Sequence, residues 1–204
     1  MATISKNGLK HGTIGGQVFY VVNGKQRVRA AAKKYTAPKK GSGVYASRSK
    51  FGTLATLAHH LLPAIKIGLH KEAKHTKSFE HNVFIKLNRK RLNGDTVDYP
   101  RLVISSGPVP VPQLENPTLS KGGILRVDFD PTLQSDKAES VYLAVYCPDE
   151  EGFLLSDPVK RTEGHLKMRL PRRWLTHPIH AYGFTLRTGL HTSPTEYLPL
   201  TPQS

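Results

Sequence analysis

The sequence of 204 residues contains one cysteine, no long hydrophobic run and very few acidic residues in its first half. Cys147 has no second cysteine to pair with, so an internal disulfide framework is excluded. Residues 1–16 lack the apolar stretch of a secretory signal, and the most apolar segment, residues 54–69, is interrupted by two histidines, a proline and a lysine. We therefore expect a reduced chain without a transmembrane span, either cytoplasmic or associated with a particle.

Motifs of catalytic and metal sites are also lacking. The chain has ten histidines, but those between residues 59 and 81 do not follow a zinc-ligand spacing, and only Glu72 and Glu80 lie near them in the sequence. Ser105-Ser106-Gly107 does not match a nucleophile elbow, and Gly15-Gly16 does not belong to a phosphate-binding loop. We predict that the protein is not an enzyme and uses neither a metal nor a cofactor.

The overall composition is that of a globular protein. Hydrophobic residues make up 38% of the chain and charged residues 22%, with 17 Gly and 15 Pro, which excludes wholesale disorder and collagen-like structure. A chain of this length can bury one substantial core or two small ones without disulfides or metal ions.

Charge is distributed very unevenly along the chain. Residues 1–94 hold 19 Lys and Arg but only two acidic residues, whereas residues 95–204 hold 11 basic and 13 acidic residues. A first half with a net charge of +17 repels itself unless counterions or a partner neutralise it, so this asymmetry favours a polyanionic partner. The alternative interpretation is a solvated basic surface without a partner.

A β-hairpin is expected near the N-terminus. Residues 18–22 and 25–29 are extended runs on either side of Asn23-Gly24, which is the strongest short hairpin signal because a type I′ turn needs positive φ at both central residues. Alternation along the returning strand places three cations on one face. These are Lys25, Arg27 and Arg29.

Residues 30–50 lack periodicity and mix Lys with Pro, Gly and Ser, which predicts an extended arm that orders only when bound. Cations with interleaved tyrosines are typical of nucleic-acid binding, because ammonium groups neutralise phosphates and a ring can stack on a base. A flexible linker with incidental lysines is the alternative. The candidate binding residues of this segment are Lys33, Lys34, Tyr35, Lys39, Lys40, Tyr45, Arg48 and Lys50.

A helical pair is predicted to follow the arm. Apolar residues from Phe51 to Leu69 recur at steps of three and four, with a kink expected at Pro63. Residues 71–92 fit either a helix or a strand, and we favour a helix that completes an αα-hairpin. Its end carries further candidate binding residues, although cations there also suit the helix dipole. They are Lys86, Arg89, Lys90 and Arg91, before an Asn93-Gly94 stop.

Beyond residue 95 the pattern is all-β. Short apolar or alternating runs separated by turn residues predict strands at 99–105, 124–129, 141–147, 152–155, 165–170, 179–186 and 195–198. The predicted fold class is therefore α+β, with a basic region at residues 1–94 and a β-sandwich of immunoglobulin or fibronectin type III character at residues 95–204. A Pro-rich stretch at residues 107–117 links the parts, while Cys147 and Trp174 are expected in the core.

Several short motifs resemble a family of domains of unknown function found in Bacteroidetes. The motifs are Gly15-Gly16-Gln17-Val18, Arg27-Val28-Arg29, Ser47-Arg48-Ser49-Lys50-Phe51, Val103-Ile104-Ser105-Ser106-Gly107 and Ala181-Tyr182-Gly183-Phe184. The resemblance covers most of the chain and implies the two-part architecture, but no activity. Where family members have a Thr-x-x-Gln stretch, this chain has Gly41-Ser42-Gly43-Val44-Tyr45, so its arm is expected to be used differently.

These observations favour a non-enzymatic protein that binds the nucleic-acid backbone without sequence specificity, with the sandwich contacting another protein or a second copy. A structural component of a larger assembly, such as a phage particle, a tail-like machine or a ribonucleoprotein, is the main alternative. Adhesion to an anionic lipid or polysaccharide uses the same charges and is a third.

Overall fold

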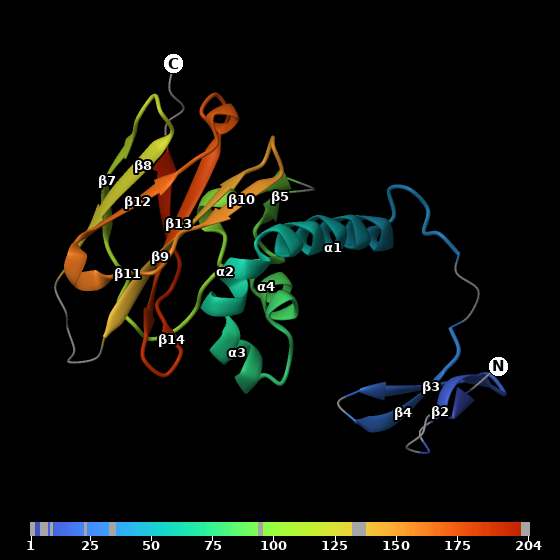
Figure 1. Ribbon diagram of the computed structural model, residues 1–204. Coiled ribbons are helices and arrows are strands. Elements are labelled where there is room, and N and C mark those ends of the chain that lie inside the picture. Colours follow the sequence, from blue (N-terminus) through green and yellow to red (C-terminus); the bar gives the residue numbers. More distant parts are fainter. Residues whose placement is uncertain are drawn as a thin grey trace. The chain divides into compact units, whose positions relative to one another are not determined.

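The computed structural model describes residues 3–4, 8, 10–22, 24–32, 36–93, 96–131 and 138–200, and it divides into two compact units, residues 1–42 and 43–204 (Figure 1). Helices and antiparallel strands both occur, so the predicted α+β class is confirmed. No helix in the described part of the chain has the length and apolar character needed to cross a membrane.

Among its described residues, the smaller unit is an antiparallel sheet with the strand order β1-β2-β3-β4. Its strands are β1 (Thr3–Ile4), β2 (Lys10–Ile14), β3 (Gln17–Val22) and β4 (Lys25–Ala30). Val22 pairs with Lys25, so β3 and β4 form the predicted hairpin around Gly24, whose φ is +73°. Ile14 pairs with Gln17 in the same way, and the intervening Gly15 and Gly16 both have positive φ. This second two-residue turn adds strands that the sequence analysis did not predict.

The larger unit begins with a layer of helices. They are α1 (Gly43–His60), α2 (Leu62–Gly68), α3 (His70–His75) and α4 (Glu80–Asn88). The predicted break near Pro63 lies at Leu61, and Pro63 falls in the first turn of α2, where its missing amide is not needed. The predicted second helix at residues 71–92 is wrong in extent. It is split by a turn at residues 76–79, where Lys77 has a φ of +50°.

Two antiparallel sheets complete the larger unit. The central sheet has the order β10-β9-β13-β14, with β11 paired to β9 and β15 to β13, and the outer sheet has the order β12-β8-β7. The strands of the central sheet are β9 (Glu139–Cys147), β10 (Gly152–Leu155), β11 (Val159–Lys160), β13 (Ile179–Arg187), β14 (His191–Thr192) and β15 (Glu196–Leu200). Those of the outer sheet are β7 (Leu114–Leu119), β8 (Ile124–Phe129) and β12 (His165–Arg169), and a short β5 (Leu92–Asn93) pairs with β6 (Thr96–Val97).

The central sheet lies between the helices and the outer sheet, so both of its faces are buried (Figure 1). On one face, Tyr146 and Phe184 pack against helical residues such as Ile65 and Phe84. On the other face, the alternate residues of β9 pack against the outer sheet. The chain divides into its compact units between residues 42 and 43, and the helices share one core with the central sheet, whereas the sequence predicted a division at 94/95.

Most strand predictions for the second half are confirmed, with β8 and β10 at the predicted bounds. The strand predicted at residues 99–105 is wrong. Its backbone is instead held by side chains, because Asn88 bonds both the N–H and the C=O of Val103, at 2.8 and 2.9 Å, and Thr195 Oγ1 accepts from Ile104 N at 2.8 Å.

The Pro-rich stretch at residues 107–117 is not only a link, because β7 begins within it. Pro117 lies on β7, an edge strand of the outer sheet, where its missing amide breaks no pairing. Residues 43–50 of the predicted arm form the first turns of α1, which is a further correction. Cys147 and Trp174 are buried between the two sheets, as predicted.

Candidate nucleic-acid interface

The clearest candidate surface is one face of β4. Strand pairing sets Lys25 opposite Val22, Arg27 opposite Tyr20 and Arg29 opposite Val18, so the three cations and Tyr20 point to the same side of the sheet. Every residue of β4 is exposed, and Tyr20 is 37% exposed. We call Lys25, Arg27, Arg29 and Tyr20 the β4 basic face. Alternation along the strand predicted that these cations share one face. It did not predict that Tyr20 lies beside them, because that depends on the register between β3 and β4.

The electrostatics of this face follow from the sequence of its unit. Residues 1–42 include nine Lys and Arg but no Asp or Glu. Neighbouring cations on alternate strand positions therefore have no carboxylate of their own unit to pair with, and an anionic partner would relieve their repulsion. An extended row of exposed cations beside an aromatic ring fits a strand of phosphates with accessible bases.

The structure only partly describes the predicted arm. Lys39 and Lys40 are exposed, and the Lys39 carbonyl accepts a 3.1 Å hydrogen bond from Ser42 N, which forms a turn. Lys33, Lys34 and Tyr35 lie outside the described residues. Lys39 and Lys40 therefore present their charge to solvent.

Tyr45, Arg48 and Lys50 lie on α1 and belong to the larger unit. Tyr45 and Arg48 are exposed and, being three residues apart, share one side of the helix, whereas Lys50 is half-buried on another side. The first buried residue of α1 is Leu54, so the turns that carry these side chains precede the packed part of the helix.

The last predicted cluster surrounds the end of α4. Lys86 is on α4, and Arg89, Lys90 and Arg91 follow its last residue, with all but the half-buried Arg91 exposed. Arg91 lines a hollow of about 380 Å³ together with Arg101 and Tyr197. Sequence reasoning missed Arg101, which reaches the same hollow as Arg91 only through the fold of the chain and pairs with Asp98 at 3.6 Å.

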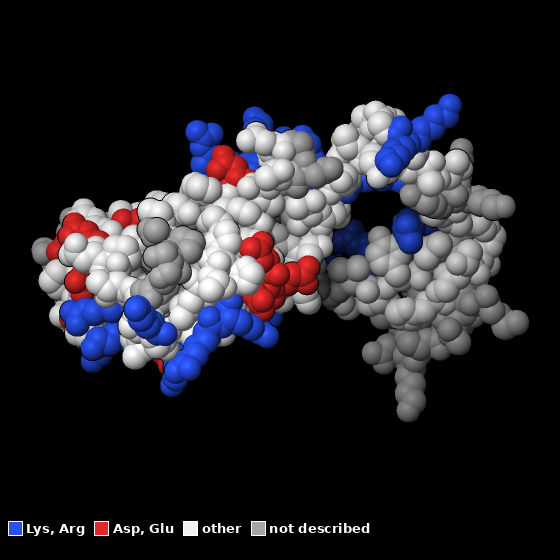
Figure 2. All heavy atoms as spheres, turned by 90° about the horizontal axis from the view of Figure 1, so that it is seen from above, with Lys and Arg blue, Asp and Glu red and all other residues white. Residues whose placement is uncertain are grey.

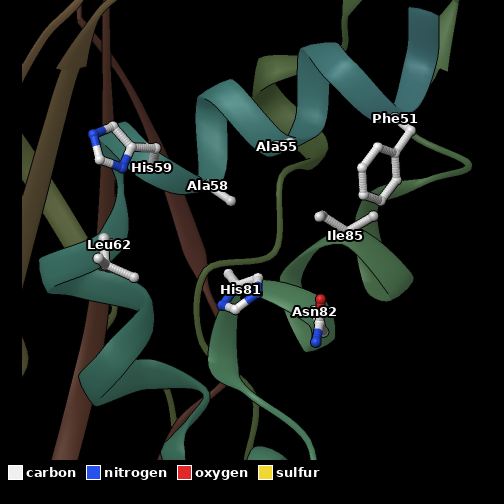
Figure 3. Close-up of a pocket in the computed structure, with 8 residues that line it drawn as sticks. All are labelled: Phe51, Ala55, Ala58, His59, Leu62, His81, Asn82 and Ile85. Atoms are coloured by element: carbon white, nitrogen blue, oxygen red, sulfur yellow. The ribbon is translucent and has the colours of Figure 1, made fainter. Parts of the chain in front are cut away.

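An apolar hollow of about 260 Å³ lies between α1 and α4 (Figure 3). Figure 3 shows Phe51 and Ile85 pointing toward one another across it, with His59 and His81 also among its lining residues. The residues that line it provide neither a carboxylate nor a thiol nucleophile. In the described parts of the chain, the His, Cys, Asp and Glu residues form no group of three or more that could hold a metal ion.

Histidine and tyrosine side chains gather where the central sheet meets the helices. The His180 ring stacks on Tyr99 with centroids 4.3 Å apart, and His180 Nδ1 lies 2.9 Å from the Tyr197 hydroxyl. Burial lowers the pKa of His180 and raises the pKa of Tyr146 to about 12. These rings are therefore uncharged at neutral pH, and the cluster acts as polar core packing.

Burial also raises the pKa of the Cys147 thiol, at the end of β9. A raised pKa keeps the sulfur protonated at neutral pH, and the thiolate is the reactive form. Cys147 is therefore an unreactive core residue.

Comparisons with known proteins find no match to the chain among protein-family models, curated proteins or solved structures. The resemblance to the Bacteroidetes family stays a prediction.

Proposed function

We propose that the protein is a non-enzymatic nucleic-acid-associated protein that binds the phosphate backbone through its basic N-terminal part. The observation that carries the proposal is the β4 basic face, where three exposed cations and a tyrosine share one side of a sheet in a unit without acidic residues. Lys39, Lys40 and the cluster after α4 add exposed cations. Contacts of this kind position a nucleic acid without reading base edges, so we expect binding independent of sequence.

We further propose that the two sheets of the larger unit form an immunoglobulin-like sandwich that serves as a protein-interaction module. In that fold the first, second and fifth strands share one sheet, and the third, sixth and seventh share the other. Counting β7, β8, β9, β10, β12, β13 and β15 as these strands gives the same partition. The fourth strand, β10, pairs with β9 in the central sheet rather than joining the outer sheet.

Salt dependence tests the proposed function. Binding of the full chain to a fluorescently labelled 30-nucleotide single strand and to the matching duplex is measured by anisotropy at several salt concentrations. If about six to ten phosphates are neutralised, affinity falls by about 10³ to 10⁵ between 50 and 200 mM salt. An affinity that does not change with salt overturns the proposal.

A variant series tests the β4 basic face itself. Lys25→Gln/Arg27→Gln/Arg29→Gln removes three charges from the face, while the control Lys66→Gln/Lys74→Gln/Lys77→Gln removes three exposed charges from the helix layer. The β4 variant is expected to flatten the salt dependence by about two to three units of slope, because each lost phosphate contact removes about 0.7 to 0.9. Equal effects of the two variants would show that only net charge matters.

A second candidate function, a structural part of a larger assembly, is favoured by the opposite face of the same sheet. Ile14 and Val28 lie there, each 50% exposed, and no residue of the smaller unit whose side chain is described is buried. Sheets are stabilised by covering an apolar face. Limited proteolysis within residues 30–42, suppressed by a protein partner but not by nucleic acid, would support this function instead.

A further inference from the structure

The outer sheet carries a second cationic surface, in the half of the chain whose acidic residues outnumber its basic ones. Along β8, Leu125, Val127 and Phe129 point into the core, so Arg126 points to solvent between them. Along β12, Leu166 points inward and its neighbours Lys167 and Arg169 are exposed. The pairing of β8 with β12 sets Lys167 directly opposite Arg126. We call Arg126, Lys167 and Arg169 the outer-sheet face.

Two further cations lie at the same end of this sheet. Lys121 is in the turn between β7 and β8, and Arg172 follows β12; both are exposed. Leu170 N donates a 2.7 Å hydrogen bond to Gly123 O, which holds these two connections side by side. Figure 2 shows a group of Lys and Arg side chains at the end of the larger unit where β7, β8 and β12 lie in Figure 1.

Several acidic residues of the same half form ion pairs away from Lys167 and Arg169. Glu139 is buried in an ion pair with Arg161, and Asp149 and Glu150 lie in the turn after β9, near His177 and Arg173. On the outer-sheet face, Asp128 pairs with Arg126 at 3.1 Å. No ion pair is found for Lys167 or Arg169 within the described ranges. Glu115 of β7 is exposed and lies opposite Asp128, so the sheet is acidic toward these two residues and basic toward Arg169.

This arrangement carries a cost in stability, because like charges directly opposite one another on paired strands repel. Sheet surfaces of soluble proteins commonly intersperse the two signs. A row of cations kept on a flat, exposed sheet, in a region with acidic residues to spare, indicates that the row binds something anionic. Lys167 and Arg169 are about 6.7 Å apart along the strand, and Arg126 is about 5 Å across from Lys167, a flat array that suits an extended polyanion better than a small anion.

We propose that the outer-sheet face is a second nucleic-acid surface, which takes the phosphate backbone on Arg126, Lys167 and Arg169. This inference rests on the proposed function and extends it, since the β-sandwich then takes part in binding rather than only contacting protein. The partner is nucleic acid rather than an acidic protein because the exposed cations form a flat row along two paired strands, which suits a phosphate backbone.

The test compares four full-length proteins by anisotropy with the labelled strand and duplex across a salt series. They are the wild type, the β4 variant, the outer-sheet variant Arg126→Gln/Lys167→Gln/Arg169→Gln, and the helix-layer control. The slope of log affinity against log salt concentration is expected to fall in magnitude by about two to three units for the outer-sheet variant and to change little for the control. An outer-sheet variant that matches the control overturns the inference.

The outcomes separate the two proposals. If the wild type does not bind nucleic acid, the proposed function fails and this inference fails with it. A second outcome is that the wild type binds nucleic acid, the β4 variant binds more weakly and the outer-sheet variant binds as the wild type does. In that case only this inference fails.

A single substitution distinguishes binding from folding. Lys167→Glu places a carboxylate opposite Arg126, so the melting temperature should stay equal or rise while affinity falls at least tenfold. Unchanged affinity in this folded variant contradicts the inference, and the conservative Lys167→Arg should retain wild-type affinity.

Discussion

The guanidinium of Arg161 lies 3.0 Å from the carboxylate of Glu139, and both side chains are almost fully buried, at 2% and 1% exposed. Arg161 also donates to the carbonyls of Asp130 and Val111, at 3.0 and 3.2 Å. The other carboxylate oxygen of Glu139 accepts from Arg187 Nε at 2.8 Å. This network ties β9 and β13 to the chain segments that lead into the outer sheet.

Replacing Arg161 by Met should therefore be severely destabilising. The substitution leaves Glu139 buried with less compensation, which typically costs about 3–5 kcal/mol in the free energy of unfolding. Urea denaturation measures the loss. The control is Arg173→Met, because Arg173 pairs with Glu150 at 2.9 Å but is 69% exposed, and an exposed pair contributes about 1 kcal/mol or less. Similar losses in both variants would contradict the role given to the buried network.

Gly152→Ala should destabilise the larger unit through a steric clash. A Cβ at Gly152 would lie 2.1 Å from Trp174 Cζ2, so the ring or the strand must shift, at a cost of about 1–3 kcal/mol. The control is Gly52→Ala in α1, where a Cβ meets nothing within 4 Å and Ala should stabilise the helix by about 0.5–1 kcal/mol. Thermal melting followed by fluorescence of Trp174, the single tryptophan, measures both changes. An unchanged melting temperature for Gly152→Ala would show that the Trp174 ring can shift without a loss of stability.

Stability should fall in mild acid because of His180. Burial lowers its pKa below the ordinary 6.5, so the unfolded chain binds a proton at pH values where the folded chain does not. This contribution is therefore present above about pH 6.5 and is lost as the pH falls toward the lowered folded value. Melting temperatures at about pH 7.5 and 5.5 should decline less for His180→Gln than for the wild type. Parallel declines would exclude His180 as the cause.

Lys167→Glu should raise the free energy of unfolding by about 0.2–1 kcal/mol, because a favourable cross-strand pair with Arg126 replaces a repulsive one. The gain should shrink in high salt, which screens exposed charges. Urea denaturation at low and high salt measures it. A stability loss at low salt would mean that Lys167 supports the fold in a way that the register does not show.

Local signals accounted for much of the fold. Gly24 and the alternation on either side of it predicted the β3–β4 hairpin, and short apolar runs between turns predicted β8 and β10. The partner of the helical stripe could not be predicted in this way. Leu54, Ala58 and Leu61 recur at steps of three and four, which predicts that they are buried but not that they share a core with Tyr146 and Phe184. The unbroken apolar run of β9 was the available signal, since such runs are typical of strands buried on both faces.

The same distinction explains what was missed in the candidate site. Period-2 alternation within β4 grouped its cations, because these residues are neighbours in the sequence. Arg126 and Lys167 are opposite one another only through the pairing of β8 with β12, and the net charge of the second half averages them with distant acidic residues. Arg101 and Arg91 likewise line one hollow only because the folded chain brings them to it.

The position of the central sheet between two layers has a consequence for synthesis on the ribosome. Phe84 of the helix layer shares a core with residues of β13, which is synthesised roughly 100 residues later. At typical elongation rates, the delay between the synthesis of Phe84 and that of β13 is about 5–20 s. Until both β9 and β13 have been made, the central sheet cannot cover the apolar side of the nascent helices. Early association with a chaperone would protect the chain until the C-terminal strands emerge.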